Sequence, residues 1–144
     1  MLSGRCLCGG VQYEIDGPLR SMYHCHCSIC RRASGSSFAT NAVIAKADFS
    51  VVAGQDLISN FGSSAGIRRH FCSRCGSPLY ASVDQSPNIL SLRCGTLDAD
   101  PHTRPTFHIY VKSRAPWYDI SDQLLQLDER GSPEEVQRLF FPVA

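Results

Sequence analysis

The sequence predicts a mainly β domain with one short helix at its C-terminus. Short β-prone segments alternate with turns rich in Gly, Pro and Ser along most of the chain. Seven of the eight cysteines fall in three tight clusters, which indicates that the chain folds around them. With 144 residues, 43% of them hydrophobic, the chain can bury a core, and we expect a single domain over residues 1–144.

The first extended segment covers residues 4–16, and a Gly-Gly pair divides it. Glycine allows the sharp change of direction that a chain needs at such a point. After the pair, hydrophobic and polar residues alternate as in a half-buried strand, and three side chains are expected to face the interior: Val11, Tyr13 and Ile15. The turn sequence Asp-Gly-Pro at 16–18 then allows residues 19–25 to run back as a second strand.

Further short strands fill the middle of the chain. Residues 28–33 are expected to form one helical turn. The strands predicted after it are 37–45, 49–52, 57–61, 67–72, 79–83, 89–94 and 107–111. Residues 62–66, Gly-Ser-Ser-Ala-Gly, predict a loop between two of them. Three aromatic residues are expected in the core rather than in a ligand site: Phe107, Trp117 and Tyr118.

The C-terminal helix is predicted from its start signal. Residues 132–135, Ser-Pro-Glu-Glu, form a capping box with serine at the N-cap, proline at the first helical position and glutamate three residues after the cap. Val136, Leu139 and Phe140 then recur at helical spacing. We therefore expect this helix to pack on the sheet with that hydrophobic face.

The balance of charge argues against nucleic acid as a partner. The formal net charge is +1, so the chain lacks the overall basic field that dominates nucleic-acid binding. Basic residues pair locally, at Arg31/Arg32 and Arg68/Arg69, which favours a small anionic ligand. No run approaches the roughly 18 apolar residues of a membrane span, and residues 1–10 lack the apolar centre of a signal peptide. We expect a cytoplasmic protein with no membrane partner.

The spacing of the cysteines is typical of zinc sites. In a reducing cytosol, clustered cysteines serve as metal ligands or redox groups more often than as disulfides. Two pairs, at x1 and x2 spacing, each bring two sulfurs to one side of a short segment, and one triplet supplies three more. These numbers predict a zinc closed by four thiolates and a second zinc with an open position. The closed site would use Cys6, Cys8, Cys72 and Cys75, and the open site Cys25, Cys27 and Cys30.

The fourth ligand of the open site is undecided at this level. A protein ligand can close it, and the candidates are Cys94, His24, His26, His70 and His108. His24 and His26 flank Cys25 and can serve as acid–base groups. Strand alternation, however, points them to the face opposite the sulfurs, where packing or support of the ligands is at least as consistent. Cys94 is expected to be a buried apolar thiol.

Taken together, these segments resemble the glutathione-dependent formaldehyde-activating enzyme family, which also includes centromere protein V-like members. The matching segments are Cys6-x-Cys8-Gly-Gly, His24-Cys-His-Cys-Ser-x-Cys-Arg31, Gly54, Ser63-Ser64, Arg69-x-Phe-Cys-x2-Cys-Gly76, Gly95-x-Leu-Asp98 and His108 to Trp117. They cover most of the chain in the family's order. The resemblance is specific because cysteine and non-cysteine positions agree together.

This resemblance implies a β-tent, a fold of paired antiparallel sheets around zinc sites. It implies two zincs per chain, a structural one at the four-cysteine site and a catalytic one at Cys25, Cys27 and Cys30. It also implies carbon–sulfur lyase chemistry, in which glutathione adds to formaldehyde to give S-hydroxymethylglutathione, or a related thiol reacts with an aldehyde. Because one fold hosts divergent functions, the substrate is an expectation only.

Arg31 and Arg32 are the predicted ligand-binding residues. A zinc held by three thiolates carries a net charge of −1, which weakens its attraction for a further anion. The two arginines can offset that charge and hold a carboxylate, for which the planar guanidinium is suited. The other interpretation makes them solvated surface arginines.

Two other functions compete with the enzyme hypothesis. Four protein ligands on the second zinc would favour a zinc-stabilised binding module without catalysis. Metal-free and readily oxidised cysteines would favour a thiol redox or metal-handling protein.

Overall fold

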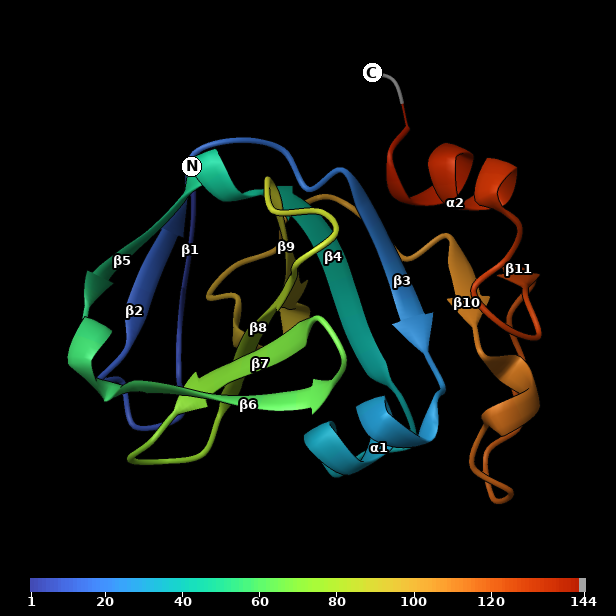
Figure 1. Ribbon diagram of the computed structural model, residues 1–144, viewed down its shortest axis with the longest axis horizontal. Helices are drawn as coiled ribbons and strands as arrows, with labels where there is room; N and C mark the ends of the chain where they lie inside the picture. Colours follow the sequence, from blue (N-terminus) through green and yellow to red (C-terminus); the bar gives the residue numbers. More distant parts are fainter. Residues whose placement is uncertain (143–144) are drawn as a thin grey trace.

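The computed structural model describes residues 1–142, and within them two β-sheets dominate (Figure 1). The strands are β1 (Leu2–Arg5), β2 (Gln12–Ile15), β3 (Ser21–Cys25), β4 (Ala39–Ala45), β5 (Phe49–Ala53), β6 (Ile58–Ser64), β7 (Ile67–Cys72), β8 (Pro78–Val83), β9 (Ile89–Arg93), β10 (Phe107–Ile109) and β11 (Leu125–Gln126). The helices are α1 (Ser28–Ser34), α2 (Pro133–Phe140) and the 3₁₀ turns η1 (Lys46–Asp48), η2 (Gln55–Leu57), η3 (Cys94–Thr96) and η4 (Val111–Ser113). The mainly β fold class with a short C-terminal helix is confirmed.

The smaller sheet has the strand order β1-β2-β5, and the larger one β11-β10-β3-β4-β9-β8-β7-β6. Most neighbours are antiparallel, but β10 runs parallel to both β3 and β11. The expectation that residues 19–25 run back on the preceding strand is wrong, since β3 pairs with β4 and β10 in the other sheet. The turn at 16–18 instead carries the chain from one sheet to the next, because Asp16 N–H bonds Asp48 O and Arg20 N–H bonds Val43 O.

The larger sheet has a different environment on each face. One face packs on the smaller sheet and forms a core in which the predicted inward residues are buried: Val11, Tyr13 and Ile15. Along β3, β4 and β9, every second side chain faces this core, and the side chains between them face the opposite side of the sheet. There a second core forms around Tyr23, Phe107 and Phe140. The two faces therefore offer two separate interiors for the cysteine clusters.

Helix α2 covers one end of the second core. Its capping box is present, with Ser132 Oγ accepting from Glu135 N–H and Glu135 Oε1 accepting from Ser132 N–H. Phe140 lies edge-on to Tyr23 with ring centroids 4.8 Å apart. The predicted packing of this helix on the sheet is thus confirmed, as is the burial of Phe107.

Two local expectations are wrong. The loop predicted at 62–66 is shorter, because β6 continues to Ser64 with an irregularity after Gly62 and only two residues turn the chain into β7. Trp117 is 72% exposed instead of buried. Its indole N–H bonds Ser37 Oγ, so the ring lies on the surface beyond α1. Among the described residues, no helix has the length and apolar character needed to cross a membrane.

Candidate functional site

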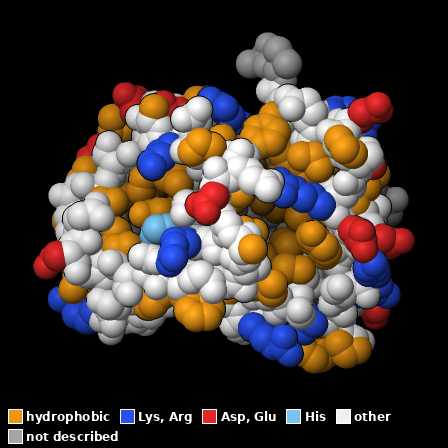
Figure 2. All heavy atoms as spheres, viewed as in Figure 1, with side chains coloured by type: hydrophobic (Ala, Val, Ile, Leu, Met, Phe, Trp, Pro, Cys, Tyr) orange, Lys and Arg blue, Asp and Glu red, His pale blue; other side chains and the backbone are white. Residues whose placement is uncertain are grey.

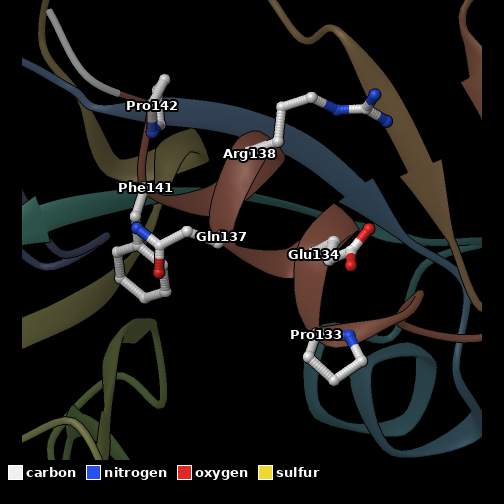
Figure 3. A pocket seen from close by; sticks show the side chains of 6 residues that line it. All are labelled: Pro133, Glu134, Gln137, Arg138, Phe141 and Pro142. Atoms are coloured by element: carbon white, nitrogen blue, oxygen red, sulfur yellow. The ribbon is translucent and has the colours of Figure 1, made fainter.

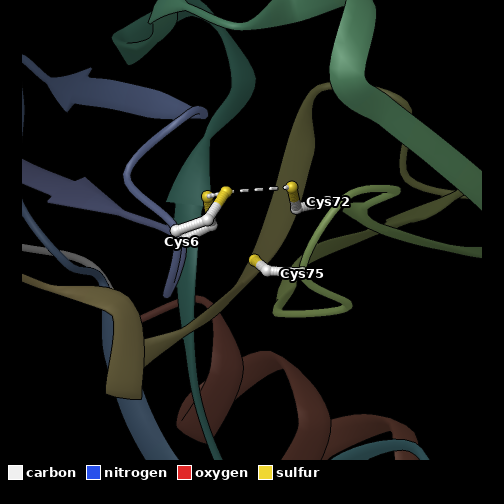
Figure 4. Close-up of side chains that lie close together, drawn as sticks. Cys6, Cys72 and Cys75 are labelled. Carbon is white, nitrogen blue, oxygen red and sulfur yellow. Dashed lines mark hydrogen bonds between the residues drawn. The ribbon is translucent and has the colours of Figure 1, made fainter.

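Four cysteines from two distant turns meet at one point between the sheets. Cys6 and Cys8 follow β1, while Cys72 ends β7 and Cys75 lies in the next turn. Figure 4 shows the labelled sulfurs from the two turns directed toward one another. The Sγ atoms of Cys6, Cys8, Cys72 and Cys75 all lie within 4.8 Å of one another. The structure therefore brings together the predicted closed set across 64 residues of sequence.

The sulfur spacing fits zinc. A tetrahedron with Zn–S bonds of roughly 2.3 Å has S···S edges of about 3.8 Å. The Sγ atoms of Cys6 and Cys8 are 3.5 Å apart, and those of Cys8 and Cys72 are 3.9 Å apart. Each pair is followed by a glycine with positive φ, Gly9 at 76° and Gly76 at 80°. These glycines let the chain turn back immediately after the sulfurs, where a side chain would be strained.

Donors surround the sulfurs of this four-cysteine site. Val11 N–H bonds Cys6 Sγ, and Gly10 N–H bonds Cys8 Sγ. The bond from Gly10 and the bond from Arg74 both lower the pKa of Cys8. Such donors favour the thiolate form that binds a metal ion. The chemistry of the site thus fits a bound metal cation.

The second cluster is local in sequence and lies on the other face of the larger sheet. Cys25 ends β3, Cys27 is the N-cap of α1, and Cys30 lies in the first turn of that helix. Cys27 Sγ accepts from Cys30 N–H at 3.2 Å, which fixes the turn. The three Sγ atoms lie within 4.8 Å of one another. We call this group the three-cysteine site.

The electrostatics of the three-cysteine site favour a cation. Hydrogen bonds from Cys25 and Cys27 lower the pKa of Cys30 to about 2, and the positive charges of Arg93 and Arg69 act in the same direction. The same sharing of protons with Cys27 and Cys30, together with burial, raises the pKa of Cys25. The three neighbouring sulfurs, two of them on buried cysteines, therefore ionise together only when a positive ion compensates them.

Within residues 1–142, no further Cys, His, Asp or Glu joins the three-cysteine site with a ligand atom inside the same 4.8 Å limit. The candidates named from the sequence lie elsewhere. Cys94 is buried in the first core, and burial raises its pKa to about 12, as expected for an apolar thiol. His70 stacks on Tyr80 and bonds Ser82 Oγ.

The remaining histidines form a buried polar chain behind the sulfurs. His26 Nε2 lies 2.8 Å from His108 Nδ1, and His108 Nε2 lies 3.0 Å from the Asp122 carboxylate. His24 bonds Thr40 Oγ1 on the same side of the sheet. Burial lowers the pKa of His26 to about 4, so its ring is neutral. These histidines lie on the face opposite Cys25, as strand alternation predicts.

A cavity of about 400 Å³ opens over the three-cysteine site, and all three cysteines line it. The volume falls within the range of small-molecule sites, about 300–1,000 Å³. Figure 2 shows a recess in the region that β3 and β4 occupy in Figure 1, with hydrophobic side chains in its floor and basic side chains beside it. Three arginines from separate segments line the cavity: Arg69, Arg93 and Arg130. Arg69 also approaches Cys30 Sγ at 3.8 Å.

Arg31 and Arg32 lie outside this cavity. They line a separate depression of about 460 Å³ together with Ser37 and Trp117. A third depression, of about 680 Å³, lies on the outer face of α2 (Figure 3). It is lined by Pro133, Glu134, Gln137, Arg138, Phe141 and Pro142, so it contains neither a thiol nor an imidazole.

The sequence interpretation missed the cavity arginines as a group, although it noted the pair at 68 and 69. Asn41 and Arg93 are the signal that was available, because each is a polar residue at an inward position of a strand that is mostly hydrophobic. The pairing of β4 with β9 brings Asn41 and Arg93 together, and the sequence pattern does not specify which strands pair.

Comparisons with known proteins agree with this architecture. Residues 1–113 match the family described as glutathione-dependent formaldehyde-activating enzyme. A relative from Halomonas elongata is 30% identical over 94% of this chain and 90% of its own length. A Fusarium vanettenii relative is 35% identical, and the matched region covers 56% of this chain and 45% of that longer protein. Both have the provisional name glutathione-dependent formaldehyde-activating enzyme.

A solved structure shares the fold. The crystal structure of a Rhodobacter sphaeroides protein superimposes with a TM-score of 0.59 at 24% identity, covering 68% of this chain and 89% of that one. The match in sequence extends from β1 through η4 and includes both cysteine sites. The chain therefore belongs to the glutathione-dependent formaldehyde-activating enzyme family.

Proposed function

We propose that the protein is a zinc-dependent carbon–sulfur lyase that joins glutathione, or a closely related thiol, to formaldehyde. One observation carries the proposal. Cys25, Cys27 and Cys30 line a ligand-sized cavity, and no fourth protein ligand joins their sulfurs in the described part of the chain. Three protein ligands with an accessible fourth position are typical of catalytic zinc, whereas structural zinc is closed. The family membership supports the same activity.

The reaction is an addition without oxidation. The thiol sulfur forms a bond to the formaldehyde carbon while the C=O π bond breaks. The thiol proton is released and the former carbonyl oxygen gains one, so the product is S-hydroxymethylglutathione. The reverse direction breaks the same carbon–sulfur bond. A zinc ion at the three-cysteine site would supply a Lewis acid that lowers the pKa of an incoming thiol or polarises a carbonyl oxygen.

The protein's own groups prepare this position. Arg69 places its guanidinium within 3.9 Å of Cys30 Sγ and holds Ser63 Oγ with its Nε–H, so its charge is fixed beside the sulfurs. This charge offsets the surplus negative charge of three thiolates and favours a further anion such as a thiolate. The hydrophobic wall formed by Ile67, Ala81 and Ile109 limits the access of water to the reacting groups.

The four-cysteine site has a different role in this proposal. It contains a full set of thiolates and lies in the core between the sheets, so it holds the fold together and takes no part in the reaction.

The test is zinc analysis combined with exchange spectroscopy. We expect two zincs per wild-type chain and faster interconversion of glutathione and its hydroxymethyl adduct than in a protein-free sample, since the two compounds also combine unaided. Cys27→Ser should retain one zinc and the fold but lose the acceleration. The control is Cys94→Ala, a buried cysteine outside both sites, which should keep both zincs and the acceleration.

Two outcomes would contradict the proposal. One is exchange in the wild-type protein no faster than without protein, which would favour a zinc-stabilised binding module. The other is full acceleration by Cys27→Ser.

A further inference from the structure

A row of three polar side chains crosses the floor of the cavity. Tyr23 of β3 pairs with Asn41 of β4, and Asn41 pairs with Arg93 of β9. Residues that are paired across neighbouring strands project from the same face, with Cβ atoms about 4.5–5.5 Å apart. All three line the cavity, and Cys25 of the three-cysteine site is two residues from Tyr23 on the same face. The row is therefore within reach of a molecule bound at the sulfurs.

Arg93 is a buried charge that no carboxylate pairs with in the described residues. Its side chain is 9% exposed, and its Nη1–H donates to the neutral Ser91 Oγ. Within residues 1–142 it forms no ion pair, and no Asp or Glu lines the cavity. A buried guanidinium left unpaired is costly, whereas a carboxylate in its planar fork satisfies it with two parallel bonds. The cavity thus lacks an anion at this position.

Asn41 has the opposite requirement. It is 3% exposed, and its Oδ1 has no hydrogen-bond partner in the described residues. A buried carbonyl oxygen of this kind needs an N–H or O–H donor. A ligand that satisfies the row must then offer a carboxylate and a donor close together, which is a property of amino acids and peptides.

The wider charge of the cavity agrees with an anionic ligand. Arg69 and Arg130 line it with Arg93, and Arg130 lies over the ring of Phe140 with its Cζ 5.2 Å from the centroid. Three thiolates around a divalent cation carry a net charge of −1, so three arginines leave the cavity positive. A neutral thiol would gain nothing from this field, whereas a carboxylate-bearing thiol would be attracted.

We propose that Asn41 and Arg93 are specificity-determining residues that select thiols of the amino-acid or peptide class. Arg93 binds a carboxylate of the substrate, and Asn41 Oδ1 accepts from a substrate N–H group. This inference rests on the proposed function, because it assumes that the substrate sulfur is bound at the three-cysteine site. It assigns the anion-binding role to cavity residues instead of Arg31 and Arg32, which line a separate depression.

Binding measured by calorimetry tests the assignment. The probes are glutathione, S-methylglutathione, whose blocked sulfur cannot form a thiolate, and 3-mercaptopropionate, a thiol with a carboxylate and no N–H. Arg93→Lys keeps the charge but loses the planar fork, so we expect about ten- to hundredfold weaker binding of all three probes. Asn41→Leu should weaken both glutathione compounds about tenfold and change 3-mercaptopropionate less than twofold.

Control variants separate this effect from damage to the fold. Arg68 neighbours Arg69 on β7 but points to the other face, where it bonds Asn60 Oδ1, so Arg68→Lys should bind every probe like wild type. Zinc content and melting temperature of each variant show whether it is folded. Arg31→Ala and Arg32→Ala test the earlier assignment, and we expect wild-type affinity from both.

The outcomes distinguish this inference from the proposed function. If the wild-type protein fails to accelerate exchange but binds S-methylglutathione with the stated variant pattern, the activity fails and the recognition stands. If exchange is accelerated while Arg93→Lys and Asn41→Leu bind like wild type, the recognition is wrong. It is also overturned if wild type does not bind S-methylglutathione, if Asn41→Leu weakens 3-mercaptopropionate equally, or if affinity depends on Arg31 or Arg32.

Discussion

A few buried polar side chains distinguish this protein from one whose core is purely hydrophobic. His26 and His108 are 0% and 1% exposed, and they reach solvent through Asp122, whose side chain is 43% exposed. The rings of Phe38 and Tyr118 pack against His26. The chain of bonds lies behind the three-cysteine site and fixes the ring of His26, the residue between two of its cysteines. We infer that it holds the segment from β3 to α1 in place.

The first prediction at this scale concerns His108. Replacing it in His108→Leu leaves His26 Nε2 buried without a partner, and an unsatisfied group of this kind costs about 1–3 kcal/mol. Urea unfolding should therefore show a loss of about that size in the free energy of unfolding. His102→Asn is the control, because His102 is exposed and asparagine tolerates its positive φ. A His108→Leu protein within about 0.5 kcal/mol of wild type would contradict the structural role.

At the scale of elements, the segment that links β5 to β6 passes very close to the backbone of the β1–β2 turn. Gly54, the residue before η2, has a φ of 77° and lies between β5 and β6. A Cβ at this position would overlap the carbonyl oxygen of Gly10, beside the four-cysteine site. Gly54→Ala should therefore lose at least about 2 kcal/mol of stability, since the left-handed conformation alone costs an alanine about 1–2 kcal/mol.

Gly62 in β6 provides the matched control for that measurement. A Cβ there would meet only Arg68 Nη1, at 3.9 Å, and φ is not positive. Gly62→Ala should leave the midpoint of urea unfolding unchanged or raise it slightly, because alanine restricts the unfolded chain. Equal losses in the two variants would show that the contact with Gly10 is unimportant.

The elements also show where local sequence patterns stop being informative. Alternation in residues 11–15 predicted a buried strand correctly, because burial on one face imposes a period of two. The start of α2 was predictable because its capping box is local. The partners of β3 were not, since β10 joins it from more than eighty residues away and in parallel orientation. Pairing depends on the packing of whole sheets, which no single segment encodes.

At the scale of the whole molecule, one part of the candidate site was predictable from the sequence and another part was not. The cysteine sets were predictable because zinc imposes short spacings within each turn. The cavity was not, because its polar groups are contributed by β4, β7, β9 and the segment before α2 and meet only after the sheets have formed. The separation of the two sites into different cores was equally invisible in the sequence.

This separation predicts that the two metals leave with different consequences. The four-cysteine site ties the β1–β2 turn to the β7–β8 turn, so a zinc ion held there would close a long loop and contribute directly to folding. The three-cysteine site joins residues only five apart, and β3 is held independently by β4 and β10. Loss of the second zinc should change the melting temperature by no more than a few degrees, whereas loss of the first should unfold the chain.

Titration with a chelator, followed by zinc analysis and circular dichroism, checks this order. We expect one zinc to be removed with the far-ultraviolet spectrum intact and the other to be lost together with the whole spectrum in one transition, as the cooperative unfolding of a single domain would produce. Cys27→Ser should show the second step alone, while Cys72→Ser should start unfolded or strongly destabilised. Removal of both zincs from a chain that stays folded would mean that hydrophobic packing alone holds the two sheets together and that the four-cysteine site is not structural.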